Sequence, residues 1–147
     1  RLSERWEGSD GVKVKLDLMA FRPTRAYKDD AGLDIYSPSG YIVPARGSVS
    51  INTGVHVEIP RGYVGMLKSK SGLNVWNGIT SEGVIDCGYT GSICVKLYNH
   101  SDEDFYVAKG QKVSQLVILP IITPDIEIVD KLSDTERGDN GFGSTGA

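Results

Sequence analysis

Apolar and polar residues alternate along most of this chain. In the stretches 12–18, 55–59 and 93–97, every second residue is apolar, and the residues between are charged, histidine or cysteine. A period of two places the apolar side chains on one face of a β-strand. β-branched and aromatic residues also concentrate in the stretches 63–67, 105–107, 113–119 and 126–129. We predict a strand in each of these stretches.

Glycine and proline separate the predicted strands, as expected for turns. They occur at 38–40, 44, 60–62, 88, 91, 110 and 124. A helical stripe is missing from the chain, and only residues 71–76 suggest a short helix. Many short strands with very little helix predict an all-β, jelly-roll-like distorted barrel or sandwich. The length of 147 residues suits one such domain.

Composition excludes several classes of protein. The net charge of −3 argues against general nucleic-acid binding through phosphates. The longest strongly apolar run, residues 117–122, includes Pro120 and is far shorter than the ~20 residues of a membrane span. A signal-peptide pattern is not visible, which favours an intracellular location. Cys87 and Cys94 lack the companions of a zinc site or disulfide framework, so we expect reduced, buried thiols.

Two further patterns carry little weight. Gly141, Gly143 and Gly146 spell G-x-G-x-x-G, but they close the chain. A dinucleotide-binding fingerprint must instead follow a strand and open a helix. His56 lies on the polar face of its predicted strand, and we expect it to be solvated. His56 and His100 therefore support no catalytic triad.

Five short stretches depart from the plain strand pattern. Asp34 interrupts an apolar run in 31–35, and residues 68–73, KSKSGL, form a plausible phosphate nest. The others are GVIDCGYTG at 83–91, GQKVSQL at 110–116 and RGDNGFGSTG at 137–146. In order and content they closely resemble the five motifs of the deoxyuridine triphosphate nucleotidohydrolases, the dUTPases. The resemblance runs from about residue 12 to residue 146 and implies a jelly-roll-like homotrimer with active sites between subunits.

The resemblance implies hydrolysis of dUTP to dUMP and pyrophosphate by attack of water on the α-phosphorus. This reaction keeps uracil out of DNA and supplies dUMP for thymidylate synthesis. Asp86 matches the aspartate that activates the attacking water as general base. Mg²⁺ is the implied cofactor, because it offsets the charge of the triphosphate. Asp34 matches an aspartate that acts on the water shell of the metal and is not a direct ligand.

Further matches concern the phosphates. Ser71 and Gly72 match residues that hold phosphate oxygens near the scissile bond, and Gln115 matches another phosphate contact. Lys70 and Lys112 stand where the family usually carries arginine. Lysine keeps the charge but loses the bidentate fork. The resemblance therefore implies a phosphate contact for Lys70, and a weaker trimer if the cation at Lys112 mainly bridges subunits.

The resemblance implies that the third stretch, residues 83–91, selects the base and the sugar of the substrate. Tyr89 resembles the tyrosine that packs on the deoxyribose and excludes a 2′-hydroxyl. The backbone of Gly83, Val84 and Ile85 is expected to read the uracil edge and to reject the methyl group of thymine. Fixed main-chain donors and acceptors suit such a small pocket.

The closing stretch resembles a mobile arm. Phe142 is expected to stack on uracil, and Arg137, Gly143, Ser144 and Thr145 to hold the γ-phosphate. These matches divide the chain into a flexible lead-in at 1–11, a β-rich core at 12–130 and an arm at 131–147 that closes over a neighbouring subunit's site.

Two alternatives remain open at this point. A dCTP deaminase shares the fold, although the glycine-aromatic arm favours a dUTPase. A trimeric interaction module of the same fold, acting on partner proteins, is the alternative from a different class. The presence of Asp86, Tyr89, Gln115 and Arg137 argues against a catalytically inactive protein.

Overall fold

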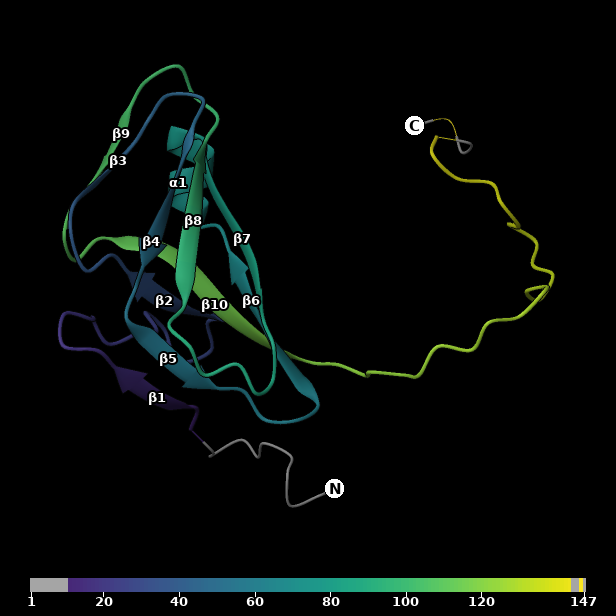
Figure 1. Ribbon diagram of the computed structural model, residues 1–147. Coiled ribbons are helices and arrows are strands. Elements are labelled where there is room, and N and C mark those ends of the chain that lie inside the picture. Colours follow the sequence, from purple (N-terminus) through teal and green to yellow (C-terminus); the bar gives the residue numbers. More distant parts are fainter. Residues whose placement is uncertain (1–10, 144–145, 147) are drawn as a thin grey trace.

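The computed structural model describes residues 11–143 and 146 and confirms the all-β prediction. Figure 1 shows a curled body of strands, with the chain after the last strand running clear of it. The elements are β1 (Lys13–Leu16), β2 (Gly32–Tyr36), β3 (Tyr41–Val43), β4 (Ser48–Asn52), β5 (Val55–Glu58), β6 (Tyr63–Lys68), α1 (Ser71–Asn77), β7 (Ile79–Ile85), β8 (Cys94–Asn99), β9 (Phe105–Val107) and β10 (Lys112–Pro120). Within this described part, no helix is long and apolar enough to cross a membrane.

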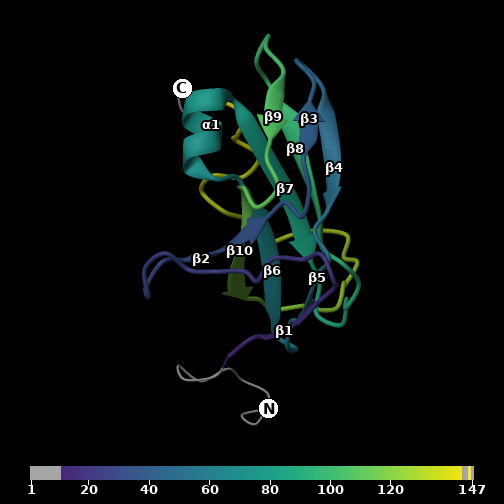
Figure 2. The ribbon, with the colours of Figure 1, turned by 90° about the vertical axis from the view of Figure 1, so that its left-hand side faces the viewer.

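One large sheet organises the body. Its six strands follow the order β2-β10-β6-β7-β8-β4, and each neighbouring pair is antiparallel. Two small antiparallel pairs, β1–β5 and β3–β9, complete the β-structure. The helix α1 lies outside the large sheet, beside β7 (Figure 2). The motif-bearing strands β2, β10 and β6 are therefore immediate neighbours.

The alternating pattern explains which side chains form the core. On β8, Val95 and Leu97 are fully buried, whereas the residues that precede each of them, Cys94 and Lys96, are exposed. On β5, Val55 and Val57 are buried in the same way. Burying aliphatic side chains of this size contributes roughly 1.5–3 kcal/mol each. The core cluster consists of Ile35, Val43, Ile51, Val55, Val57, Ile59, Leu67, Ile79, Ile85, Ile93, Val95, Leu97, Val107, Val113 and Leu116.

Most of the predicted strands are confirmed, within one or two residues at their ends. Residues 12–18 form only the shorter β1, and Val14 and Leu16 remain 38% and 40% exposed. The strand predicted at 126–129 is wrong. Ile126 and Ile128 are 86% and 89% exposed, because no other described strand lies beside them to pair with. Alternation alone does not make a strand when the backbone has no hydrogen-bonding partner.

The short helix predicted at 71–76 is confirmed as α1. It stops at Gly78, whose φ of 67° is left-handed and therefore favours glycine. The amide of Gly78 donates to the carbonyl of Asn74 at 3.1 Å, which closes the last turn. The helix begins directly after Lys70, so only Ser69 and Lys70 separate the end of β6 from the start of α1.

Candidate active site

A buried carboxylate lies at the centre of one group of motif residues. Asp34 on β2 is 4% exposed. One carboxylate oxygen is paired with Lys70 Nζ, and the other lies 3.3 Å from Lys112 Nζ. Burying a charge is costly unless it is paired, and here two ammonium groups compensate one carboxylate. The cluster keeps one excess positive charge, which suits a polyanionic ligand.

Gln115 joins this cluster through the sheet register. It lies opposite Asp34 on one side and Lys68 on the other. Its Nε2 donates to the carbonyl of Ser69 at 2.9 Å. A Cβ on Gly32 would lie 2.1 Å from Gln115 Oε1, so glycine at 32 leaves the space that the amide fills. The side chain of Gln115 is therefore positioned by both neighbouring strands.

The loop before α1 is fixed in a similar way. The hydroxyl of Ser69 accepts from the amide of Ser81 on β7 at 2.9 Å. Ser71 and Gly72 follow in the first turn of α1, and both are exposed. The first, second and fourth motifs thus converge at one end of β6, where Asp34, Lys70, Ser71, Gly72 and Gln115 surround the loop.

The third motif forms a separate turn after β7. The amide of Tyr89 donates to the carbonyl of Asp86 at 3.1 Å, and Gly88 has a left-handed φ of 87°. The Tyr89 hydroxyl donates to the carbonyl of Ser92 at 2.8 Å. A Cβ on Gly91 would lie 2.6 Å from that hydroxyl oxygen, so the tyrosine lies close against the backbone. Asp86 is exposed and Tyr89 is 46% exposed, which leaves both accessible on a preformed turn.

The residues before this turn differ in the exposure of their side chains. Gly83, Val84 and Ile85 are the last residues of β7. Ile85 is only 6% exposed and belongs to the core, whereas Val84 is 59% exposed. Because the Ile85 side chain is committed to the core, any ligand at this position meets main-chain groups.

The two groups of motif residues lie at different points along β7, one level with its middle and the other beyond its last residue. Lys68 pairs with Glu82, whereas Asp86 follows Ile85 four residues further along. Four residues of strand span roughly 13 Å. The geometry of the described chain therefore does not bring Asp86 together with Asp34, Lys70 and Gln115.

The fifth motif lies away from both groups. Residues 121–140 are all exposed, and Figure 1 shows this segment clear of the body. Arg137 Nε donates to the carbonyl of Asn140 at 2.7 Å, a contact within the segment itself. Phe142 is fully exposed, Gly143 follows in a turn, and Ser144 and Thr145 lie outside the described residues. In a single chain, the motif residues thus lie in three separate places: the cluster around Asp34, the turn after β7 and the exposed segment after β10.

Metal-ligating side chains do not form a cage in the described part of the chain. Among residues 11–143 and 146, no three His, Cys, Asp or Glu side chains gather closely enough to hold a metal ion. Mg²⁺ usually keeps several waters and is bound by one or two carboxylates together with substrate phosphates. The residues therefore fit a magnesium ion that arrives with a polyphosphate, not one held in a protein cage.

Two expectations about single residues are wrong. Cys87 and Cys94 are free thiols, but both are exposed. They lie in the third-motif turn and on the outward face of β8, respectively, where the core does not reach them. His56 is not solvated, because its side chain is only 18% exposed and both ring nitrogens have partners. The spacing of apolar residues places His56 on the outer face but does not show what covers it.

Comparisons with known proteins identify the family. The family model described as dUTPase matches residues 20–146. A deoxyuridine 5′-triphosphate nucleotidohydrolase of Paramecium bursaria Chlorella virus 1 is 41% identical over 133 residues, covering 90% of this chain and 94% of its own. The chain belongs to the dUTPase family.

Solved structures extend the likeness to the fold. The Staphylococcus bacteriophage 80alpha dUTPase with dUpNHpp has a TM-score of 0.88 and 32% identity, covering 95% of this chain and all of that one. A point-mutant dUTPase from phage phi11 of S. aureus has a TM-score of 0.78 and 29% identity, covering 85% and 100%. Its description reports coordination of a structural Mg(II) ion. The jelly-roll-like fold expected from the motifs is confirmed.

Proposed function

We propose that this chain hydrolyses dUTP to dUMP and pyrophosphate. The observation that carries the proposal is the preformed turn at the end of β7, where exposed Asp86 and Tyr89 accompany a buried Ile85. Relatives that are 41% identical over at least 90% of this chain are named as deoxyuridine 5′-triphosphate nucleotidohydrolases. Asp86 acts as general base for the attacking water, a role typically worth ~10²–10⁴ in rate. The product dUMP is then available for thymidylate synthesis, and uracil is kept out of DNA.

Substrate selection is assigned to the same turn. Tyr89 packs on the deoxyribose and leaves no room for a 2′-hydroxyl. Its orientation is supported by the hydrogen bond to Ser92. The backbone of Gly83, Val84 and Ile85 reads uracil, in keeping with the buried side chain of Ile85. Main-chain groups in a strand are rigid, so they discriminate a methyl group by close approach.

Phosphate binding is assigned to the cluster around Asp34. Lys70, Ser71, Gly72 and Gln115 hold phosphate oxygens, and the excess positive charge of the Lys70–Asp34–Lys112 group favours a polyanion. Preorganised donors of this kind cost little reorganisation when charge develops in the transition state. The bond from Gln115 to the Ser69 carbonyl supports such preorganisation.

We assign magnesium an indirect place beside this cluster. Asp34, whose two oxygens are paired with Lys70 and Lys112, would meet a Mg²⁺ ion only through water, and the triphosphate would carry the ion. The ion, when bound, neutralises phosphate charge and polarises phosphoryl oxygens. The absence of a carboxylate cage among the described residues is compatible with this outer position.

The separation of the motif groups supports assembly into a homotrimer. Because Asp86 lies four residues of strand beyond the level of the Asp34 cluster, a complete site requires more than one copy. Residues 131–147 form an arm that reaches a neighbouring subunit's site. There Phe142 stacks on uracil, and Arg137, Gly143, Ser144 and Thr145 hold the γ-phosphate. The exposure of residues 121–140 supports an arm that is ordered by contacts outside its own chain.

Pyrophosphate release from a nucleotide panel tests the proposal. We expect rapid release from dUTP with Mg²⁺, a large loss with EDTA, and little release from dTTP, dCTP or UTP. Equal hydrolysis of all four nucleotides would contradict the assigned pocket. Ammonia release from dCTP would instead indicate a deaminase.

A further inference from the structure

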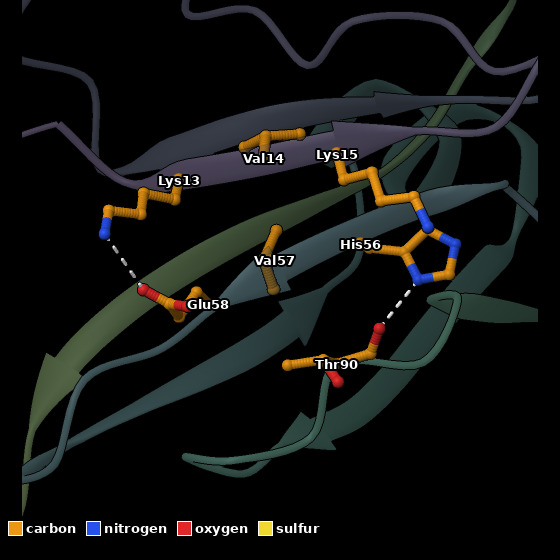
Figure 3. Close-up of a pocket in the computed structure, with 7 residues that line it drawn as sticks. All are labelled: Lys13, Val14, Lys15, His56, Val57, Glu58 and Thr90. Carbon is orange, nitrogen blue, oxygen red and sulfur yellow. Dashed lines mark hydrogen bonds and ion pairs between the residues drawn. The ribbon is translucent and has the colours of Figure 1, made fainter.

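His56 bridges two parts of the chain that are distant in sequence. It lies on β5, opposite Lys15 of β1. Its Nδ1 lies 2.7 Å from the carbonyl oxygen of Thr90, and its Nε2 lies 3.0 Å from a carboxylate oxygen of Asp17. Figure 3 shows the ring between β1 and the loop that carries Thr90. The imidazole therefore connects β5 to the segment after β1 and to the loop after the third-motif turn.

The partners of His56 determine its protonation. A backbone carbonyl and an ionised carboxylate can only accept hydrogen bonds. A neutral imidazole donates from one nitrogen only, so one of the two contacts would lose its proton. The imidazolium donates from both. Donation to Thr90, and secondly to Asp17, raises the pKa of His56 above its ordinary value of 6.5, while burial and nearby Lys15 oppose the shift.

Each end of the bridge is fixed to the body or to the site. The amide of Asp17 donates to the carbonyl of Gly54 at 2.9 Å, which anchors Asp17 beside β5. Thr90 follows Tyr89 directly, and Tyr89 closes the turn on Asp86. At the far end of the loop, Ser92 Oγ accepts from the amide of Gly54 at 3.0 Å. His56 thus holds the middle of the loop, between the turn and this second attachment.

We propose that protonated His56 is a positioning residue that holds the Asp86–Tyr89 turn in its active geometry. Loss of its proton leaves one N–H donor for two acceptors, so the ring gives up either Thr90 itself or its own anchor at Asp17. Both outcomes weaken the bridge, so the order of the turn and the turnover of dUTP decline as pH rises. The effect on turnover rests on the proposed dUTPase function, whereas the effect on the order of the turn does not. His56 touches no reacting atom in this scheme and acts through the backbone of Thr90.

The sign of the pH dependence follows from the direction of the shift. Because folding raises the pKa of His56, its contribution is fully present below about pH 6.5 and is lost as pH rises through the folded value. Asp17 from the segment after β1 favours the charged ring, and Lys15 from β1 disfavours it. His56 lines a groove together with Lys13 and Glu58. These two side chains pair with each other at 3.5 Å, so their charges largely cancel at His56.

Hydrogen exchange of the backbone amides in residues 86–92 tests the proposal on the free, full-length protein. After correction for intrinsic rates, we expect protection in the wild type to fall on the order of tenfold across one pH step above 6.5. Asp17→Asn should move the midpoint to lower pH, and Lys15→Gln should move it to higher pH. His56→Gln should abolish the step. Thr90→Ala is the matched control, because it keeps the carbonyl and should titrate like the wild type.

The kcat for dUTP, measured on the same proteins across the same pH range, should show the same order of midpoints. A step that persists in His56→Gln, or midpoints that do not move with Asp17 and Lys15, would overturn the proposal. An exchange step that responds to these variants while kcat does not would also overturn it, because His56 would then be structural only. If no protein hydrolyses dUTP, the proposed function fails, and the exchange data still decide the role of His56.

Discussion

Lys70 forms an ion pair with Asp34 across 36 positions of sequence, at the point where β2, β10 and β6 lie side by side. The carboxylate is almost completely buried, and Lys112 occupies its second oxygen. Both lysines therefore act within one chain. Their first effect is to compensate a buried charge, and their second is to leave positive charge at the proposed phosphate site.

Removing Lys70 should destabilise the protein more than removing Lys112. The Lys70 side chain is 25% exposed and the Lys112 side chain 45%, so Lys70→Met should cost more. We expect a loss of about 1–3 kcal/mol for Lys70→Met, because Lys112 still pairs with Asp34. Urea denaturation at fixed protein concentration measures the difference. The exposed pair of Lys13 with Glu58 supplies the control, and Lys13→Met should change stability by less than about 1 kcal/mol. Equal losses for Lys70 and Lys13 would refute the interpretation of a buried pair.

Gly32→Ala should disturb the phosphate site without touching a charged residue. The added Cβ would collide with the side chain of Gln115, including Gln115 Cβ at 2.9 Å. We expect a loss of about 1–3 kcal/mol in stability and a raised KM for dUTP, because the amide must leave Ser69. The double variant Gly32→Ala with Gln115→Ala should recover part of the stability, since the contacts with Gln115 Oε1 and Cδ are gone and only the one with Cβ remains. Simple additivity of the two losses would show that the clash is not the cause.

Asp86→Asn should separate chemistry from folding. Asp86 is exposed, and its turn is closed by its backbone carbonyl, which the substitution retains. We expect an unchanged melting temperature and a fall in kcat of at least ~10²–10⁴. Steady-state pyrophosphate release measures the fall. A variant with near-normal turnover would remove Asp86 from the role of general base.

Truncation after Glu136 tests the arm. Because residues 121–140 are all exposed, their loss should leave thermal stability nearly unchanged. We expect the truncated protein to lose most of its activity, since Arg137 and Phe142 are gone. Phe142→Ala is a smaller change that should mainly weaken substrate binding, by the roughly 1–3 kcal/mol typical of base stacking. Full activity of the truncated protein would refute a closing arm.

The sequence predicts the fold better where residues alternate than where they do not. The strands β5 and β8 follow directly from alternating apolar residues. The strand β2 was not predicted, because buried Asp34 interrupts its apolar pattern, and its compensation by Lys70 and Lys112 depends on tertiary contacts. Residues 126–129 show the opposite error, since they are rich in β-branched residues but have no strand beside them in the described chain.

The motifs predict the candidate residues of the site, but they do not predict how these residues are arranged in space. Motif order gives no indication that Asp86 and Gln115 lie at different ends of the sheet, because that depends on the register of β6 with β7 and β10. Nor does the sequence offer a reason to connect His56 with Thr90. That contact arises where β5 passes under the loop, and spacing along one strand cannot reveal it.

The central claim is that one active site combines residues of different subunits, and mixing two inactive variants tests it most directly. Asp86→Asn lacks the proposed general base, and Ser71→Ala with Gln115→Ala lacks proposed phosphate contacts in the Asp34 cluster. Equal amounts should be co-folded, and pyrophosphate release from dUTP should be compared with each parent. If the two groups meet between subunits, random assembly places intact groups together at about one quarter of interfaces. The account predicts recovery to about that fraction of wild-type activity. A mixture no more active than its parents would contradict it.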